Sequence, residues 1–298
     1  MKIESSVSEK LSTGQKVKAF LVLGKHRLTM FVAISAAFGY AVAAGTSFSW
    51  LLLGVMTLAG FLITAGTNAL NQIFEREWDA MMKRTAARPL PTGQLSIKEA
   101  AIFGVGAGVV GVALIGYFFN LPAALLGIIG YLSYAFVYTP LKRISPFSVF
   151  VGAIPGALPP LIGVTGVTGT IDNFGLILFA FQFFWQFPHF WAIAWVAHED
   201  YSRAGFKMLP SVSGKTPFSA TVIMYYALIT IPLAFLPYLM GMIALWQAIV
   251  LGLAGIYFFI PAWQLFRTQE DQFARKLMFA SFLYLPLIQL TFLLNIWL

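Results

Sequence analysis

Nine apolar stretches, each close to the roughly 20 residues that cross the hydrocarbon core of a bilayer, divide the chain after residue 27. Inside a bilayer each backbone N–H and C=O must be paired within the protein, so each stretch is expected to be a helix. The composition, 59% hydrophobic and 10% charged, lies outside the range of soluble domains. We therefore predict an all-α, polytopic membrane protein with a cytoplasmic N-terminal tail, 1–27, and one domain, 28–298. Its nine spans are 28–45, 50–74, 99–119, 121–139, 147–166, 173–196, 218–240, 243–265 and 275–297.

The positive charges give the orientation. All 19 lysine and arginine residues lie in the tail or in every second loop, and the remaining loops contain none. The positive-inside rule places the tail and the charged loops in the cytoplasm, and nine spans then place Leu298 outside. The net charge of +8 thus indicates a membrane topology and predicts no nucleic-acid partner.

The N-terminus and the absence of cysteine restrict the compartment and the chemistry. The first 27 residues have neither the apolar core of a signal peptide nor the arginine-rich, acid-poor pattern of a transit peptide. These features favour the plasma (inner) membrane of a bacterium. Without cysteine, disulfides and thiolate nucleophiles are excluded.

The second span ends in a polar stripe. Asn71, Glu75 and Asp79 are spaced four apart, so on a helix they drift by only about 40° per step and share one face. Carboxylates at the mouth of a membrane helix are costly unless they have a function. Oxygen ligands of this kind suit Mg²⁺, which completes its coordination with substrate phosphates. The stripe predicts a magnesium site.

A basic loop follows the stripe. Lys83, Arg84 and Arg88 are suited to bind the remaining charge of a phosphate group. The alternative is an interfacial helix end whose acids only pair with Arg76 and Arg84. We favour the magnesium site, because the stripe lies at the end of a membrane helix and leads into a basic loop.

The sixth span repeats this pattern with different side chains. On an unbroken helix Gln182, His189 and Asp200 lie within about 20° of one another, Gln186 lies about 60° away, and His198 points the opposite way. The stripe predicts a second functional face. The alternative for His189 is a histidine that is hydrogen-bonded to the backbone of a neighbouring helix.

Another motif, Tyr138-Thr139-Pro140-Leu141-Lys142-Arg143, lies at the end of the fourth span. Lys142 and Arg143 are either ordinary cytoplasmic-side cations or phosphate contacts, and Lys207 in a later loop is a further candidate.

In this order the motifs resemble the UbiA-type intramembrane prenyltransferases, over roughly residues 20–215. The stretches 152–160, 185–191 and 199–210 are similar to the haem-farnesylating branch of that superfamily. Two departures concern the site: Glu75 stands where aspartate is commoner, and Glu199 and Asp200, with His189 nearby, replace the second aspartate motif.

The resemblance implies nine helices around a central cavity that opens to the cytoplasmic side. It implies that Mg²⁺ is the cofactor and that farnesyl diphosphate and haem b are the substrates. The reaction would transfer a farnesyl group to a haem vinyl group, with addition of water, and give haem O and diphosphate for terminal oxidases. The partners would be the lipid bilayer and either haem A synthase or terminal oxidase assembly. The alternatives are a 4-hydroxybenzoate-type polyprenyltransferase of quinone biosynthesis and a haem transporter without chemistry.

Residue chemistry and resemblance together define the candidate site. The metal ligands are Asn71, Glu75 and Asp79, and the catalytic set adds His189, Glu199 and Asp200. The substrate-binding set is Lys83, Arg84, Arg88, Lys142, Arg143, Lys207, Gln186 and Tyr138. For His189 three roles stay open: ligand of the haem iron, orientation of the porphyrin, or activation of water.

Overall fold

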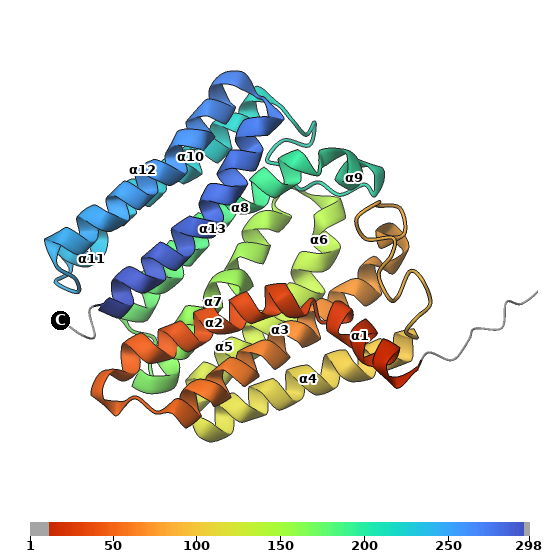
Figure 1. Ribbon diagram of the computed structural model, residues 1–298, viewed down its shortest axis with the longest axis horizontal. Coiled ribbons are helices and arrows are strands. Elements are labelled where there is room, and N and C mark those ends of the chain that lie inside the picture. The colour runs from red at the N-terminus through yellow and green to blue at the C-terminus, as the bar shows by residue number, and fades with distance from the viewer. Residues whose placement is uncertain (1–11, 295–298) are drawn as a thin grey trace, which may run out of the picture.

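The computed structural model describes residues 12–294, and within this range all regular elements are helices apart from one isolated bridge, Ser211 to Gly214. The prediction of an all-α protein is confirmed (Figure 1). The helices are α1 (Thr13–Leu23), α2 (His26–Ala44), α3 (Trp50–Asp79), α4 (Ile97–Phe118), α5 (Leu121–Leu132), α6 (Thr139–Ile144), α7 (Ser148–Thr168), α8 (Asn173–Val196), α9 (His198–Arg203), α10 (Pro217–Leu233), α11 (Leu236–Leu239), α12 (Leu245–Thr268) and α13 (Asp271–Leu294). Two short turns complete them, the 3-10 turn η1 (Gly45–Ser47) and the π-helical turn η2 (Ser133–Tyr138).

In the described range, 9 helical segments are long and apolar enough to span a membrane, as predicted. Several boundaries differ from the expected ones. The second span continues as α3 to Asp79 instead of ending at 74, and the last begins at Asp271 instead of 275. The predicted end of the last span at 297 and the position of Leu298 lie outside the described residues.

The predicted tail contains a helix that hydropathy did not show. The helix α1 begins after Ser12, whose hydroxyl accepts from the backbone N–H of Gln15, while the Gln15 side chain accepts from the N–H of Ser12. This capping box explains why a polar segment is helical. The first 11 residues of the tail lie outside the described part of the chain.

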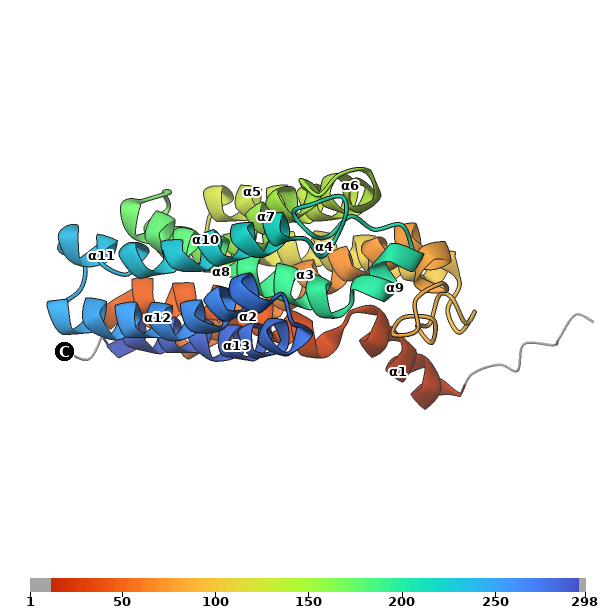
Figure 2. The same ribbon diagram turned by 90° about the horizontal axis from the view of Figure 1, so that it is seen from above.

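The helices form one bundle with two distinct ends. α2 packs on α3 and α7, α7 packs on α8, and α13 packs on α8, α12 and α2. Figure 2 shows α1, α9 and the loop between α3 and α4 at one end of the bundle, and α11 at the other. The loops that the sequence predicts to be functional therefore gather at a single end.

Small residues allow α2 and α7 to approach closely. A Cβ atom built on Gly163 would lie 2.2 Å from the Ala36 carbonyl oxygen, and one on Gly39 would lie 2.1 Å from that of Pro160. Such backbone-to-backbone contact is typical of membrane helix pairs, whose association depends on close packing.

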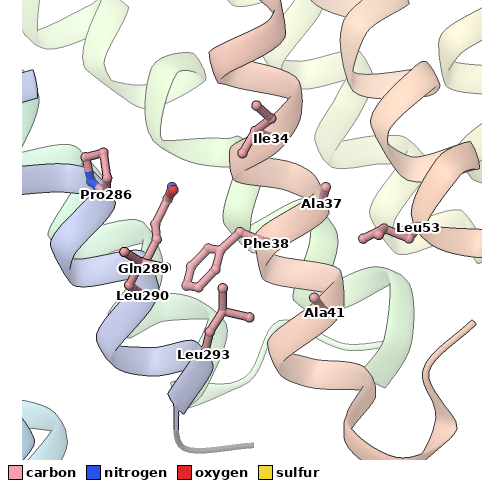
Figure 3. A pocket seen from close by; sticks show the side chains of 9 residues that line it. All are labelled: Ile34, Ala37, Phe38, Ala41, Leu53, Pro286, Gln289, Leu290 and Leu293. Atoms are coloured by element: carbon pink, nitrogen blue, oxygen red, sulfur yellow. The ribbon is translucent and has the colours of Figure 1, made fainter. Parts of the chain in front are cut away.

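An apolar groove of about 340 Å³ lies between α2 and α13, in the half of the bundle remote from α9 (Figure 3). Its lining residues are Ile34, Ala37, Phe38, Ala41, Leu53, Pro286, Gln289, Leu290 and Leu293. Gln289 is the polar member, and its Nε2 donates to Ser35 Oγ at 2.9 Å, which ties the two helices together beside the groove.

Candidate active site

The last three turns of α3 carry the predicted metal ligands. Asn71, Glu75 and Asp79 are all buried, with exposed fractions of 0%, 4% and 0%. α3 is unbroken to Asp79, so the predicted common face is present. Buried carboxylates require charged or hydrogen-bonding partners, and each of these three side chains has one.

The partner of Glu75 comes from α6. Lys142 Nζ donates to Glu75 Oε1 at 2.8 Å, and both side chains are almost fully buried. The same ammonium lies 4.5 Å from the centroid of the Tyr138 ring, which adds a cation–π contact. Two residues of the predicted substrate-binding set, Tyr138 and Lys142, thus meet a predicted metal ligand.

The partner of Asp79 comes from the following loop. Arg88 Nη1 donates to Asp79 Oδ2 at 2.7 Å, and Thr85 Oγ1 donates to the Asp79 carbonyl at 2.8 Å. The loop therefore folds back over the helix end that precedes it. The other carboxylate oxygen, Asp79 Oδ1, is buried and has no hydrogen-bond partner in the described part of the chain.

The π-helical turn η2 positions the contact to Asn71. Thr139 Oγ1 donates to the Tyr134 carbonyl, five residues earlier, and accepts from Asn71 Nδ2 at 3.0 Å. Short π-helical insertions frequently occur at functional sites, because the extra residue changes which side chains face the interior.

Lys25 is a member of this cluster that sequence reasoning missed. Its Nζ lies 3.4 Å from Asn71 Oδ1, at hydrogen-bond distance. Its backbone is left-handed, with φ of 49°, a conformation that is costly for a residue other than glycine and that recurs at functional sites. Burial, together with the charges of Arg88 and Lys142, lowers the pKa of the Lys25 ammonium to about 7. One signal for this role is the glycine before Lys25 at the start of a span, but the charge pattern alone predicts only a cytoplasmic-side cation here.

These residues fit a divalent cation with a phosphorylated ligand. The unpartnered Asp79 Oδ1, with the Glu75 carboxylate and the Asn71 amide oxygen, supplies the hard oxygen donors that Mg²⁺ prefers. The described residues hold no cluster of three histidine, cysteine or acidic side chains, so the amide of Asn71 must complete such a site. Lys142 and Arg88, together with Lys25, which is partly protonated near neutral pH, surround two carboxylates, which leaves positive charge for an anion.

The alternative in which Arg76 and Arg84 only neutralise the acids of the stripe is not what the structure shows. Arg76 pairs with Glu77 at 3.1 Å, on the exposed side of α3. The Arg84 guanidinium lies 4.3 Å from the centroid of the Tyr201 ring. The acids of the stripe instead pair with Lys142 and Arg88, which lie outside α3.

The other predicted loop cations hold the charged end of the bundle together. Arg143 lies 4.5 Å from the centroid of the Trp78 ring, and Lys207 Nζ donates to the Ile144 carbonyl at 3.2 Å. The backbone N–H of Lys83 donates to Asp200 Oδ1 at 3.4 Å. The side chains of Lys83 and Arg143 are exposed and border the buried cluster without joining it.

The sixth span has its predicted bounds, 173–196, but the common face of Gln182, His189 and Asp200, which requires an unbroken helix to Asp200, is not formed. α8 ends at Val196, and Asp200 belongs to the separate helix α9, where it pairs with Arg203 at 3.1 Å. Ala197 separates the two helices, and its backbone is not helical, with φ of −94° and ψ of 19°. Glu199 is exposed on α9.

The polar residues of α8 reach two different neighbours. Gln182 Nε2 donates to the Gly156 carbonyl at 2.8 Å, and Gln186 Nε2 donates to that of Ala153 at 3.1 Å, both on α7. His189 instead contacts Ser281 of α13, with 2.6 Å between Nδ1 and Oγ. His189 is thus bonded to a neighbouring side chain, and its role and those of Gln186, Glu199 and Asp200 stay predictions.

Residues 32–285 match the UbiA prenyltransferase family. The chain belongs to this family. The family assignment agrees with the buried cluster at the end of α3. Protohaem IX farnesyltransferase of Cytophaga hutchinsonii is 45% identical over 278 residues, which cover 93% of this chain and 97% of that protein. The protein of that name from Solibacter usitatus is 39% identical over 281 residues, which cover 91% of this chain and 96% of the relative.

Solved structures of UbiA members share the fold. A digeranylgeranylglyceryl phosphate synthase superposes with a TM-score of 0.78 at 22% identity, covering 95% of this chain and 99% of the other. A UbiA homologue from Archaeoglobus fulgidus bound to DMAPP and Mg²⁺ gives a TM-score of 0.66 at 16% identity, covering 92% and 99%. With 9 apolar spans among the described residues, the chain is a multi-pass membrane protein, and its family match makes it a prenyltransferase.

Proposed function

We propose that this prenyltransferase transfers the farnesyl group of farnesyl diphosphate to a vinyl group of protohaem IX, with addition of water, and releases haem O and diphosphate. Binding of the donor, farnesyl diphosphate, is supported by the buried cluster at the end of α3. In this cluster Lys25, Lys142 and Arg88 face the oxygen ligands of the helix. The acceptor half is supported by the names of relatives that are up to 45% identical over most of the chain.

The three cations bind the departing diphosphate in this mechanism. Lys142 and Arg88 now pair with Glu75 and Asp79, and a bound diphosphate draws them away from these carboxylates. The freed oxygens of Glu75 and Asp79, with the amide of Asn71, would hold Mg²⁺, and the bound ion would supply positive charge that neutralises the leaving group. Positive groups at this position favour the transition state, because negative charge grows on the diphosphate as the bond breaks.

The C1–O bond of farnesyl diphosphate breaks, and its electron pair leaves on the diphosphate. The π electrons of a haem vinyl group then form the new bond to the allylic C1, and the positive charge passes to the vinyl carbon next to the porphyrin. Water adds to that carbon and loses a proton, which leaves a hydroxyl group. A site that excludes bulk water protects the first cation from hydrolysis.

Mass spectrometry of the product tests donor and acceptor together. The purified protein in lipid vesicles is given farnesyl diphosphate, haem b and Mg²⁺, and the extracted haem is expected to gain the mass of one farnesyl group plus one hydroxyl group. Prenylation of 4-hydroxybenzoate in place of haem would identify the quinone-type reaction. Bound haem of unchanged mass would indicate a haem carrier.

We propose that the charged end of the bundle faces the cytoplasm of a bacterium and that the chain lies in its inner membrane. The buried anion site is then reached from the side on which farnesyl diphosphate is made. A reporter inserted in the loop between α3 and α4 should be cytoplasmic, and one between η1 and α3 should be external. The reverse result would invert the proposed orientation.

We also propose that the product passes directly to haem A synthase or to terminal oxidase assembly, because haem O is poorly soluble in water. Copurification of either partner from membranes that carry an affinity-tagged chain tests this contact, and a tagged membrane protein of unrelated function is the control.

A further inference from the structure

His189 lies where α8 faces α13, apart from the polar contacts of the anion cluster. Its ring is 7% exposed, and Nδ1 lies 2.6 Å from Ser281 Oγ. In the described part of the chain, Nε2 has no hydrogen-bond partner. The polar neighbours on α8, Gln182 and Gln186, are bonded to carbonyls of α7 and leave the imidazole to α13.

The single proton of Ser281 decides the tautomer of His189. Ser281 Oγ donates to the Met278 carbonyl, so its hydroxyl has no second proton for the imidazole. The contact between Ser281 and His189 is therefore made by a proton on Nδ1. A neutral imidazole that is protonated on Nδ1 has its lone pair on Nε2, the nitrogen without a partner.

Aromatic contacts fix the direction of the ring. Trp185 stacks on His189 with centroids 4.7 Å apart and planes 15° from parallel. The indole Nε1 of Trp185 donates to the Ser281 carbonyl at 2.8 Å, so one residue of α13 holds both rings. Phe190 and Phe282 lie at the edges of the imidazole, at centroid distances of 5.2 and 5.3 Å. Aromatic side chains surround the imidazole of His189, so this region suits an apolar, planar ligand and not a phosphate.

We propose that His189 binds the iron of the porphyrin acceptor through Nε2, and that Ser281 is the positioning residue that holds the imidazole in the Nδ1-protonated form. This inference rests on the proposed function, since it takes a haem as the acceptor. A histidine that ligates a metal through one nitrogen commonly donates its other N–H to an oxygen of the protein, and loss of that oxygen weakens metal binding. Axial binding would fix the porphyrin plane, and with it the position of the reactive vinyl group.

The tautomer is measured directly by NMR. The chain has 3 histidines, so ¹⁵N-histidine labelling gives few signals, and His189→Ala assigns those of His189. In the protein without haem, the proton is expected on Nδ1. A proton on Nε2 would overturn the proposal whatever the activity.

Haem titration tests the ligand and its support. Ser281→Ala should weaken haem affinity roughly 10- to 100-fold, and Ser281→Thr, which keeps the hydroxyl, should restore most of it. In His189→Gly the absorbance and paramagnetic resonance signals of an axial imidazole should disappear and return when free imidazole is added. An unchanged spectrum in His189→Gly would overturn the proposal.

Matched measurements separate positioning from general damage. Thr291 of α13 also donates to a carbonyl of its own helix, that of Leu287 at 2.8 Å, but its hydroxyl bonds to no histidine in the described residues. Thr291→Val should therefore keep the haem spectrum. Binding of a non-hydrolysable farnesyl diphosphate analogue should stay the same in Ser281→Ala, and its loss together with haem binding would mark a collapsed fold and refute the positioning role.

Failure of this inference is distinguishable from failure of the proposed function. If the wild-type protein shows imidazole-ligated haem but forms no farnesylated product, the proposed function fails and the iron site stands. If it forms the product while His189→Gly keeps the wild-type haem spectrum, the function stands and the iron site fails.

Discussion

Lys142 Nζ lies 2.8 Å from Glu75 Oε1, although the two residues are 67 positions apart in the sequence. The pair joins α6 to α3 inside the bundle, where a lone charge is strongly disfavoured. Each charge therefore depends on the other to remain buried, and the pair provides both a cation for the diphosphate and an oxygen for a metal.

Lys142→Met should destabilise the protein by about 3–5 kcal/mol, because it leaves the Glu75 carboxylate buried and unpaired. The double variant Lys142→Met/Glu75→Gln should recover most of this loss, since no lone charge remains. Thermal unfolding in detergent measures the stability. Activity should be lost in both variants, and a double variant no more stable than the single one would contradict the argument.

Asp79→Asn should keep the fold and abolish catalysis. The amide preserves the shape of the side chain but removes the charge that holds Arg88 and supplies a metal oxygen. Diphosphate release and haem O formation should fall together by several orders of magnitude.

The matched control is Glu77→Gln on the same helix. The Glu77 side chain is 74% exposed and, among the described residues, pairs only with Arg76, so the change should leave activity near wild type. Full activity in folded Asp79→Asn would make Asp79 an interfacial charge without a catalytic role.

Lys25→Met should weaken binding of a farnesyl diphosphate analogue about tenfold or more, because it removes a cation that contacts Asn71 at the anion site. Lys25→Arg should restore part of the affinity. Lys16, which pairs with Glu99 on the exposed surface, offers the control Lys16→Met. Calorimetric titration of the three variants makes the comparison, and equal affinities would remove Lys25 from the site.

Gly163→Ala should lower stability by about 1–3 kcal/mol, because its Cβ would meet the backbone of Ala36 and force α2 and α7 apart. Gly106→Ala, in the middle of α4, is the control, since nothing lies within 4 Å of its added Cβ. Melting temperatures of the two variants measure the difference. A similar fall in both would mean that the helix pair tolerates the extra atom.

The sequence predicted the fold because membrane spans depend on local composition. The lengths of the apolar runs predicted the number of membrane spans. The spacing of Asn71, Glu75 and Asp79, four residues apart, predicted their common face, whatever their neighbours. Boundaries were less certain, because polar residues can remain helical where they are paired: α3 continues to Asp79 through contacts with Lys142 and Arg88.

The partners inside the site could not be predicted from spacing. The contact of Lys25 with Asn71 depends on a left-handed residue between α1 and α2, and that of Thr139 depends on the π-helical turn. The turn after Val196 similarly separates Asp200 from His189, against expectation. No sequence motif marks Ser281. Its hydroxyl contacts His189 only because α13 packs on α8.

The length of α3 bears on where diphosphate and the farnesylated haem would separate after the proposed reaction. Its 30 residues extend about 45 Å, against about 30 Å for the hydrocarbon core, so the helix is longer than the core is thick and its polar last turns suit the headgroup layer. Farnesyl diphosphate is an amphiphile. A site at that depth would keep its diphosphate near water and its farnesyl chain in the hydrocarbon core. In the proposed reaction, the released diphosphate would lie near the aqueous side of the membrane and the farnesylated haem near its hydrocarbon core. The position of the site would therefore release each product into the medium in which it is soluble, and neither product would have to cross the bilayer.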